Sequence, residues 1–173
     1  MTERVKKGIL KYAIFFFLTV VVFALQSSRL FDFHIFGAAA DVMPFIVAAL
    51  ALYEGPYAAG AAGFVAGLLL SLHSNTLEGL DSLFLALFGV AFAMLSTMFF
   101  RENVLLCFAG GGICLAATEL IKYVFYFYLA DGVGPAAGLM MIAGKLLRSA
   151  VGGLLVCIAV RAVSRRFNKD KEQ

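Results

Sequence analysis

The feature that most constrains this chain is a run of 18 residues without a charged side chain, from Leu83 to Phe100. A helix rises 1.5 Å per residue and the hydrocarbon core of a bilayer is about 30 Å thick, so such a run can cross it. Hydrophobic residues make up 62% of the 173 residues and charged residues only 14%, against roughly a quarter in soluble domains. The sequence therefore predicts an integral membrane protein, with a single membrane domain over 1–163 and a short charged cytoplasmic tail over 164–173.

Further apolar runs predict an all-α, polytopic bundle of about six transmembrane helices. We expect these helices at about residues 8–25, 42–53, 57–72, 83–100, 104–129 and 146–161. The second run is too short to span a bilayer by itself. Either its helix begins near Ile35, which places Asp41 inside the outer leaflet, or it tilts or thins the bilayer. If Asp41 is the N-cap, Pro44 falls in the first turn, where its missing N–H costs little.

The segment after Pro135 is the second irregular region. Lys145 and Arg148 interrupt its apolar residues, and neither part spans alone. We expect an interfacial stretch over 136–144 and then the last span, with both cations near the outer surface. Their long aliphatic stems can extend to water from that position.

Basic residues gather at both ends of the chain. The predicted topology anchors are Arg4, Lys6, Lys7, Arg161, Arg165 and Arg166. Basic residues that flank spans stay in the cytoplasm, so both termini are predicted to be cytoplasmic. The clusters lack interleaved aromatic residues and adjoin apolar spans, so nucleic-acid binding is not expected.

Three glycines mark the span over 57–72. Gly60, Gly63 and Gly67 fall three and four residues apart, on one helical face. In water each would weaken a helix by about 1 kcal/mol relative to Ala. In lipid they let a neighbouring backbone approach closely. We therefore expect this helix to be the packing centre of the bundle, with the glycine face contacting another helix or a partner.

Ionisable residues lie within the predicted spans. Glu119 and Lys122 are three residues apart and share a helix face. Such charges cost roughly 3 kcal/mol each on insertion scales and normally face the bundle interior. They form either a mutually satisfied pair or a polar site for a ligand, a proton or a partner helix. Asp41, Glu78 and Asp81 are expected near the outer face.

The sequence carries no catalytic or metal-binding motif. It has no GxSxG, HExxH or Walker pattern. His73 and the outer acidic residues lack ligand spacing on one helix, and Cys107, Cys114 and Cys157 lie in apolar runs without CxxC spacing. We expect no catalytic residue, no metal and no cofactor.

Several short motifs follow one another in a characteristic order between residues 25 and 100. They are Leu25-Gln26-Ser27-Ser28, Ala40-Asp41, Leu52-Tyr53-Glu54-Gly55-Pro56, Gly60-Ala61-Ala62-Gly63-Phe64-Val65-Ala66-Gly67 and Leu77-Glu78-Gly79-Leu80. In this order and spacing the chain resembles the rod shape-determining protein MreD family. Two positions depart from that family's pattern: Ser71 stands where an Asp is frequent, and Ala40 where a Pro is frequent.

The resemblance implies a non-catalytic membrane scaffold of the bacterial cell-elongation complex. Such a protein is a multi-pass component of the bacterial cytoplasmic (inner) membrane, surrounded by the lipid bilayer. It binds MreC within the membrane. Through MreC it helps connect the MreB filament to the peptidoglycan glycosyltransferase and transpeptidase.

A different function class fits the same outline. Substrate-binding subunits of energy-coupling-factor vitamin transporters are similar in size, with six spans and small-residue helices, and the expected fold resembles theirs. In that interpretation Glu119, Lys122, His73 and the outer loops line a vitamin pocket. A tightly held small molecule in the purified protein would distinguish the two classes. An intramembrane enzyme is a third class, with least support because no nucleophile–base pair or metal motif is present.

Overall fold

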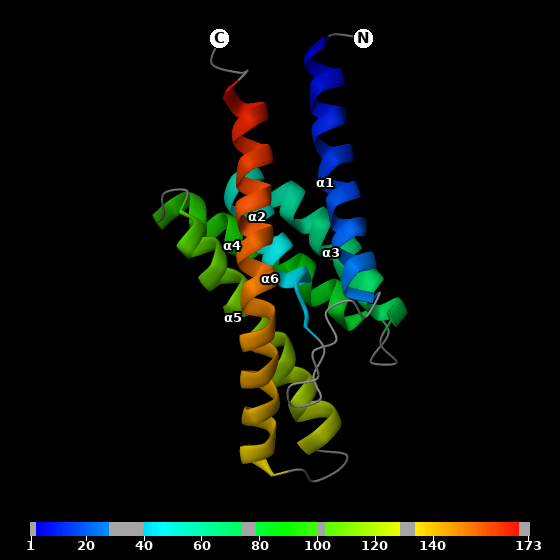
Figure 1. Ribbon diagram of the computed structural model, residues 1–173, viewed down its shortest axis with the longest axis vertical. Helices are drawn as coiled ribbons and strands as arrows, with labels where there is room; N and C mark the ends of the chain where they lie inside the picture. The colour runs from blue at the N-terminus through cyan, green and yellow to red at the C-terminus, as the bar shows by residue number, and fades with distance from the viewer. Residues whose placement is uncertain (1–2, 28–39, 74–78, 100–102, 129–133, 170–173) are drawn as a thin grey trace.

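The computed structural model is all-helical, as expected (Figure 1), and describes residues 3–27, 40–73, 79–99, 103–128 and 134–169. The elements in order are α1 (Glu3–Ser27), α2 (Met43–Glu54), α3 (Pro56–His73), α4 (Leu80–Phe99), α5 (Val104–Lys122), the π-helical turn η1 (Tyr123–Tyr128) and α6 (Pro135–Lys169).

Four helices are long and apolar enough to cross a membrane. Their apolar stretches are Gly8–Ser27, Leu80–Thr97, Val104–Phe125 and Gly138–Phe167. Helices α2 and α3 are apolar but shorter. The prediction of a membrane protein is thus supported by the described residues. Both chain termini lie at the same end of the molecule, which we name the terminus side, and the opposite end the far side (Figure 1).

The helix enclosed on all sides is α2, and not the glycine helix that was expected at the packing centre. Phe45, Ile46 and Val47 are each at most 1% exposed, and α3, α4, α5 and α6 all pack against α2. A helix that is apolar all round is typically buried. Since protein rather than lipid surrounds it, a helix of 12 residues suffices at this position.

Helix α2 begins at Met43, and residues 40–42 are not helical. The expected helix from near Ile35 through Asp41 is therefore wrong at Asp41, and residues 28–39 lie outside the described residues. Pro44 occupies the first turn, where no intrahelical partner awaits its nitrogen. Gln26, near the end of α1, accepts a hydrogen bond from the backbone N–H of Val42 at 3.3 Å.

Helix α6 is one continuous helix of 35 residues. The predicted interfacial stretch over 136–144 and a separate last span are therefore wrong. Lys145 does not interrupt the helix because its ammonium pairs with Glu119 of α5. The helix also continues through the expected tail as far as Lys169, and Ser164 is buried.

The ring of Phe45, in the centre of α2, packs against glycines of α5 and α6. A Cβ added at Gly111 or at Gly153 would overlap the ring of Phe45. The ring also contacts that of Phe108, with centroids 5.5 Å apart. The ring thus occupies space that side chains at these two positions would need, which brings α2, α5 and α6 close together.

Candidate functional site

Five charged side chains from four parts of the chain gather at the far-side end of α2. We name them the far cluster: Asp41, Asp81, Glu119, Lys122 and Lys145. Asp41 precedes α2, Asp81 lies in the first turn of α4, Glu119 and Lys122 end α5, and Lys145 belongs to α6. The sequence placed Asp41, Asp81 and Lys145 near the outer face and Glu119 and Lys122 within a span, and the structure brings all five together.

The far cluster is built from ion pairs between helices. Lys122 Nζ lies 3.0 Å from Asp81 Oδ1, and Lys145 Nζ lies 2.6 Å from Glu119 Oε2. The carboxylates are the more buried partners, with 5% and 11% of their side chains exposed, against 22% and 25% for the lysines. Glu119 and Lys122 share a helix face, but each forms its ion pair with a different helix. The cluster thus joins α4 to α5 and α5 to α6.

Asp41 adds a third carboxylate and connects α2 to α6. Its Oδ1 accepts a hydrogen bond from Met43 N–H at 3.2 Å, and its own backbone N–H donates to Ser149 Oγ at 2.9 Å. The carboxylate interacts electrostatically with Lys122, Glu119 and Lys145. Two lysines therefore lie among three acids. Glu78, the remaining predicted outer acid, lies outside the described residues.

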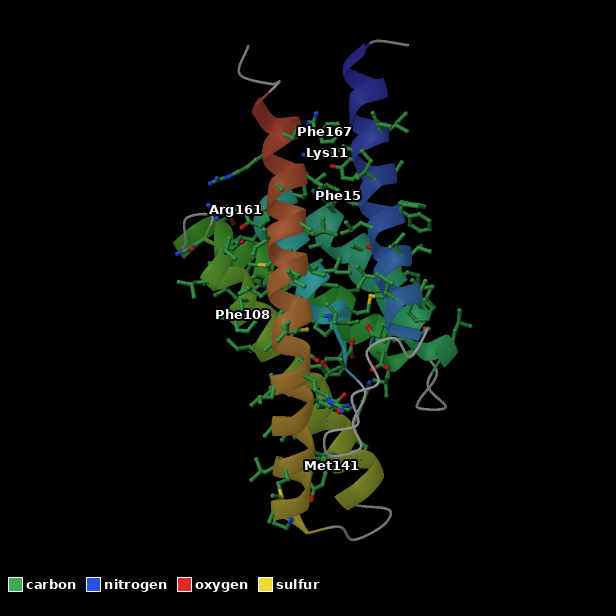
Figure 2. All side chains as sticks on the ribbon, in the orientation of Figure 1. Lys11, Phe15, Phe108, Met141, Arg161 and Phe167 are labelled. Carbon is green, nitrogen blue, oxygen red and sulfur yellow. The ribbon has the colours of Figure 1, made fainter. Side chains whose placement is uncertain are left out.

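A third buried ion pair lies at the terminus-side end of α2. Lys11 Nζ of α1 is 2.6 Å from Glu54 Oε2, and Ser164 Oγ of α6 donates to Glu54 Oε1 at 2.7 Å. Figure 2 shows Lys11 at this end of the molecule, level with the last turns of α6. We name Lys11, Glu54 and Ser164 the terminus cluster. This cluster was not predicted from the sequence, because the motif that contains Glu54 does not show that Lys11 and Ser164 lie next to it.

The two clusters together fix α2 along α6. Asp41 lies two residues before α2, whose 12 residues span about 18 Å as far as Glu54, while Ser149 and Ser164 are 15 residues apart on α6, or about 22 Å. These lengths match, so hydrogen bonds hold both ends of α2 to the same helix. Lys145 and Ser149, which sequence reasoning did not assign to the site, share one face of α6. The sequence did contain a signal for Lys145, because a buried acid such as Glu119 needs a cation close to it.

The predicted glycine face meets α4 of the same chain. A Cβ on Gly63 would overlap the backbone of Leu85, and one on Gly67 the backbone of Ser82. A Cβ on Gly60 would lie 2.8 Å from a side-chain carbon of α4. Helices α3 and α4 therefore approach nearly to backbone contact, and this face is not open to another protein.

The predicted topology anchors lie at one end of the molecule (Figure 1). Arg4, Lys6 and Lys7 fall in the first turns of α1, and Arg161, Arg165 and Arg166 in the last turns of α6. Arg165 and Arg166 are exposed. The helical turns that carry the predicted anchors of both chain ends therefore lie on the terminus side.

The contacts within both clusters are of the kind that hold helices together. Every acid in them accepts a hydrogen bond or pairs with a cation. Within the described ranges, no three or more His, Cys, Asp or Glu side chains are grouped so that they could hold a metal ion. Cys107, Cys114 and Cys157 are buried free thiols.

Comparison with known proteins adds no relative. No protein-family model, no curated protein and no solved structure matches this chain.

Proposed function

We propose that this chain is a non-catalytic membrane scaffold of the bacterial cell-elongation complex, similar to MreD, and that it binds MreC within the membrane. One observation carries the proposal: the motifs behind the resemblance coincide with the tightest turns and contacts of the bundle. Gly55 has a φ of 93°, which favours glycine, and it forms the turn between α2 and α3 with Glu54 and Pro56. Gly63 and Gly67 allow the close approach of α3 and α4.

The proposed setting is the bacterial inner membrane, crossed by six helices, of which α2 and α3 are the shorter two. Both termini face the cytoplasm in this proposal, because the basic ends of α1 and α6 lie on one side. Through MreC the protein supports the MreB filament and the peptidoglycan glycosyltransferase and transpeptidase. The chain devotes little mass to loops, so contact within the bilayer is the natural mode of binding.

The ion pairs favour this proposal over a vitamin-binding subunit. A pocket for a polar vitamin would need free polar groups, and Glu119 and Lys122 are engaged with Lys145 and Asp81. We propose that the helix arrangement resembles that of energy-coupling-factor substrate-binding subunits while the interior serves packing.

Crosslinking in living cells tests the proposal directly. A photo-crosslinking amino acid placed at exposed, lipid-facing positions such as Phe64, Leu87 or Val151 should capture MreC in host membranes. Depletion of the protein in a rod-shaped host should make cells widen and round. Cells that stay rod-shaped, with MreC absent from every adduct, would refute the proposal.

A ligand assay separates the scaffold from the transporter subunit. The protein is purified without added vitamins, denatured, and the released small molecules are identified by mass spectrometry. A scaffold should release no vitamin. A vitamin recovered at about one per chain would favour transport instead.

A further inference from the structure

Among the described residues, the far cluster holds more acids than cations. Asp81 and Glu119 each have a lysine ammonium within 3.0 Å. The lysines that interact with Asp41 are the same two, Lys122 and Lys145. With every group charged, three carboxylates face two ammonium groups, which leaves one negative charge in excess. A charge without a counter-ion is costly to bury, so we expect one carboxyl of the cluster to be neutral.

Asp41 is the carboxyl with the least support for a negative charge. Both lysines give their short ion pairs to the other two acids. The Oδ1 of Asp41 accepts a hydrogen bond from Met43 N–H at 3.2 Å, and a neutral donor of this kind stabilises a carboxylate less than an ammonium does. Burial raises the pKa of Asp41, the nearby Glu119 adds to the rise, and the two lysines oppose it. Asp41 is therefore the acid of the far cluster that most readily holds a proton.

Other polar groups reach this region from each neighbouring helix. Helix α4 contributes Asp81, and α5 contributes the buried thiol of Cys114, which interacts with Asp41. Helix α6 contributes Arg148, which has interactions of its own and is not among the electrostatic partners of Asp41. Helix α1 contributes the neutral amide of Gln26. Among the described residues, the two lysines are thus the cations that act on Asp41.

Lys122 shows why a charged Asp41 would disturb the cluster. Its ammonium lies 3.0 Å from Asp81 Oδ1 and also interacts with Asp41 and Glu119. Asp81 Oδ2 is buried, and no hydrogen-bond donor of the described residues reaches it. Asp81 therefore depends on Lys122, and a carboxylate at Asp41 would compete for the same ammonium. A proton on Asp41 leaves Lys122 to Asp81.

We propose that the far cluster is a proton-binding site, in which the carboxyl of Asp41 keeps a proton at neutral pH beside two complete lysine–carboxylate pairs. The proton comes from water and bonds to a carboxylate oxygen of Asp41, which leaves the cluster without net charge. A metal ion is a poor alternative, since no three described His, Cys, Asp or Glu side chains are grouped so that they could hold one. The proton site does not depend on MreC binding.

Asp41→Asn tests the site, because an asparagine has nearly the shape of a protonated aspartic acid. Asp81→Asn is the matched control, since it removes a charge that is paired with Lys122. Thermal unfolding of the purified full-length protein at neutral pH, in one fixed detergent, should show Asp41→Asn as stable as the parent and Asp81→Asn less stable. If Asp41 were a charged partner of a cation, including Arg148, Asp41→Asn would be destabilised like Asp81→Asn, and this outcome would overturn the proposal.

The pH dependence of unfolding gives a second test, and its sign is fixed. An acid that holds its proton more tightly in the folded state stabilises folding most at low pH, and this contribution is lost as the pH rises above its ordinary pKa of 3.8 toward the raised value. The stability of the parent relative to Asp41→Asn should therefore fall with rising pH, by up to about tenfold in the folding equilibrium constant per pH unit. A relative stability that rises with pH, or that follows the sodium concentration instead, would refute the proton site.

Infrared difference spectroscopy detects the proton itself. A protonated carboxyl has a C=O stretching band that a carboxylate lacks. At neutral pH this band should be present in the parent and in Asp81→Asn, and absent from Asp41→Asn. A band of equal strength in the parent and in Asp41→Asn, or no band in the parent, would show that Asp41 does not carry the proton.

Discussion

At the residue scale, the molecule keeps charge inside an apolar bundle by pairing it across helices. Lys145 and Glu119 come from α6 and α5, and Lys122 and Asp81 from α5 and α4. A lone ion of this kind costs several kcal/mol to bury, and a close counter-ion offsets much of that cost. The far cluster is therefore sensitive to the loss of one member and tolerant of the loss of a pair.

Glu119→Gln tests which lysine is the true partner. The substitution leaves Lys145 without its counter-ion and should lower the stability of the purified protein by about 3 kcal/mol. The double variant Glu119→Gln/Lys145→Met should recover most of that loss. Thermal unfolding in one fixed detergent measures both.

The control for this prediction replaces the other lysine. Glu119→Gln/Lys122→Met leaves Lys145 unpaired and also breaks the bond to Asp81, so it should be less stable than Glu119→Gln alone. Recovery with Lys122→Met instead of Lys145→Met would contradict the pairing in the structure.

The sequence singled out four members of the far cluster, but it did not predict which of the five form ion pairs with one another. Glu119 and Lys122 were located as charges within an apolar run, and Asp41 and Asp81 were placed near the outer face by the order of the spans. The ion pairs were not predicted, because the spacing of residues along one helix shows only which of them share a face of that helix. Lysine side chains are long enough to reach a neighbouring helix, and which helix is adjacent is a property of the fold.

At the element scale, the lengths of the apolar runs led to wrong bounds for two helices. The short run over 42–53 was expected either to be extended or to tilt or thin the bilayer, yet α2 stays short and is surrounded by four helices. Lys145 was expected to separate an interfacial stretch from the last span, yet α6 is continuous and Glu119 neutralises that charge. Both differences arise from neighbours that sequence periodicity does not show, whereas Gly55 and Pro56 are a local signal for the turn between α2 and α3.

Gly63→Ala tests the contact between α3 and α4. The added methyl group would overlap the Leu85 backbone, so stability should fall by roughly 1–3 kcal/mol. Gly112→Ala is the matched control, because its nearest contact is an ordinary 3.9 Å from a Leu146 methyl carbon. Thermal unfolding should show the first variant destabilised and the control unchanged or stabilised. Equal melting of both would mean that the helices do not meet at Gly63.

Lys11→Met tests how α1 is attached. Helix α1 exposes a long apolar face that includes Phe16 and Phe17, and its buried ion pair to Glu54 joins it to α2. Loss of the ammonium should loosen the helix, with faster hydrogen–deuterium exchange in α1 and little change in α2. Lys6→Met is the control at the same helix end. Identical exchange in both variants would show that the ion pair does not hold α1.

At the scale of the whole molecule, the cations on the terminus side and those on the far side have different roles. Cations at the terminus side, such as Arg165 and Arg166, are exposed. Basic residues that flank a span favour the cytoplasmic side when the protein inserts into the membrane. Cations at the far side, Lys122 and Lys145, are paired with acids and carry little net charge. Lys122 and Lys145 therefore need not oppose the orientation that both chain ends favour.

Lys145→Met is consequently expected to leave the orientation of the protein unchanged. Fusions of a fluorescent protein that folds only in the cytoplasm, placed at either terminus, should fluoresce equally in the parent and in this variant. Alkaline phosphatase at the same positions should be inactive, because it needs the oxidising side of the membrane. Replacement of Arg161, Arg165 and Arg166 by Gln is the opposing test, since it removes the positive charge at the end of α6 and should reduce the fraction with a cytoplasmic C-terminus. Active phosphatase at the parent C-terminus would contradict the proposed topology, and a reorientation caused by Lys145→Met would show that this lysine acts as a free charge during insertion.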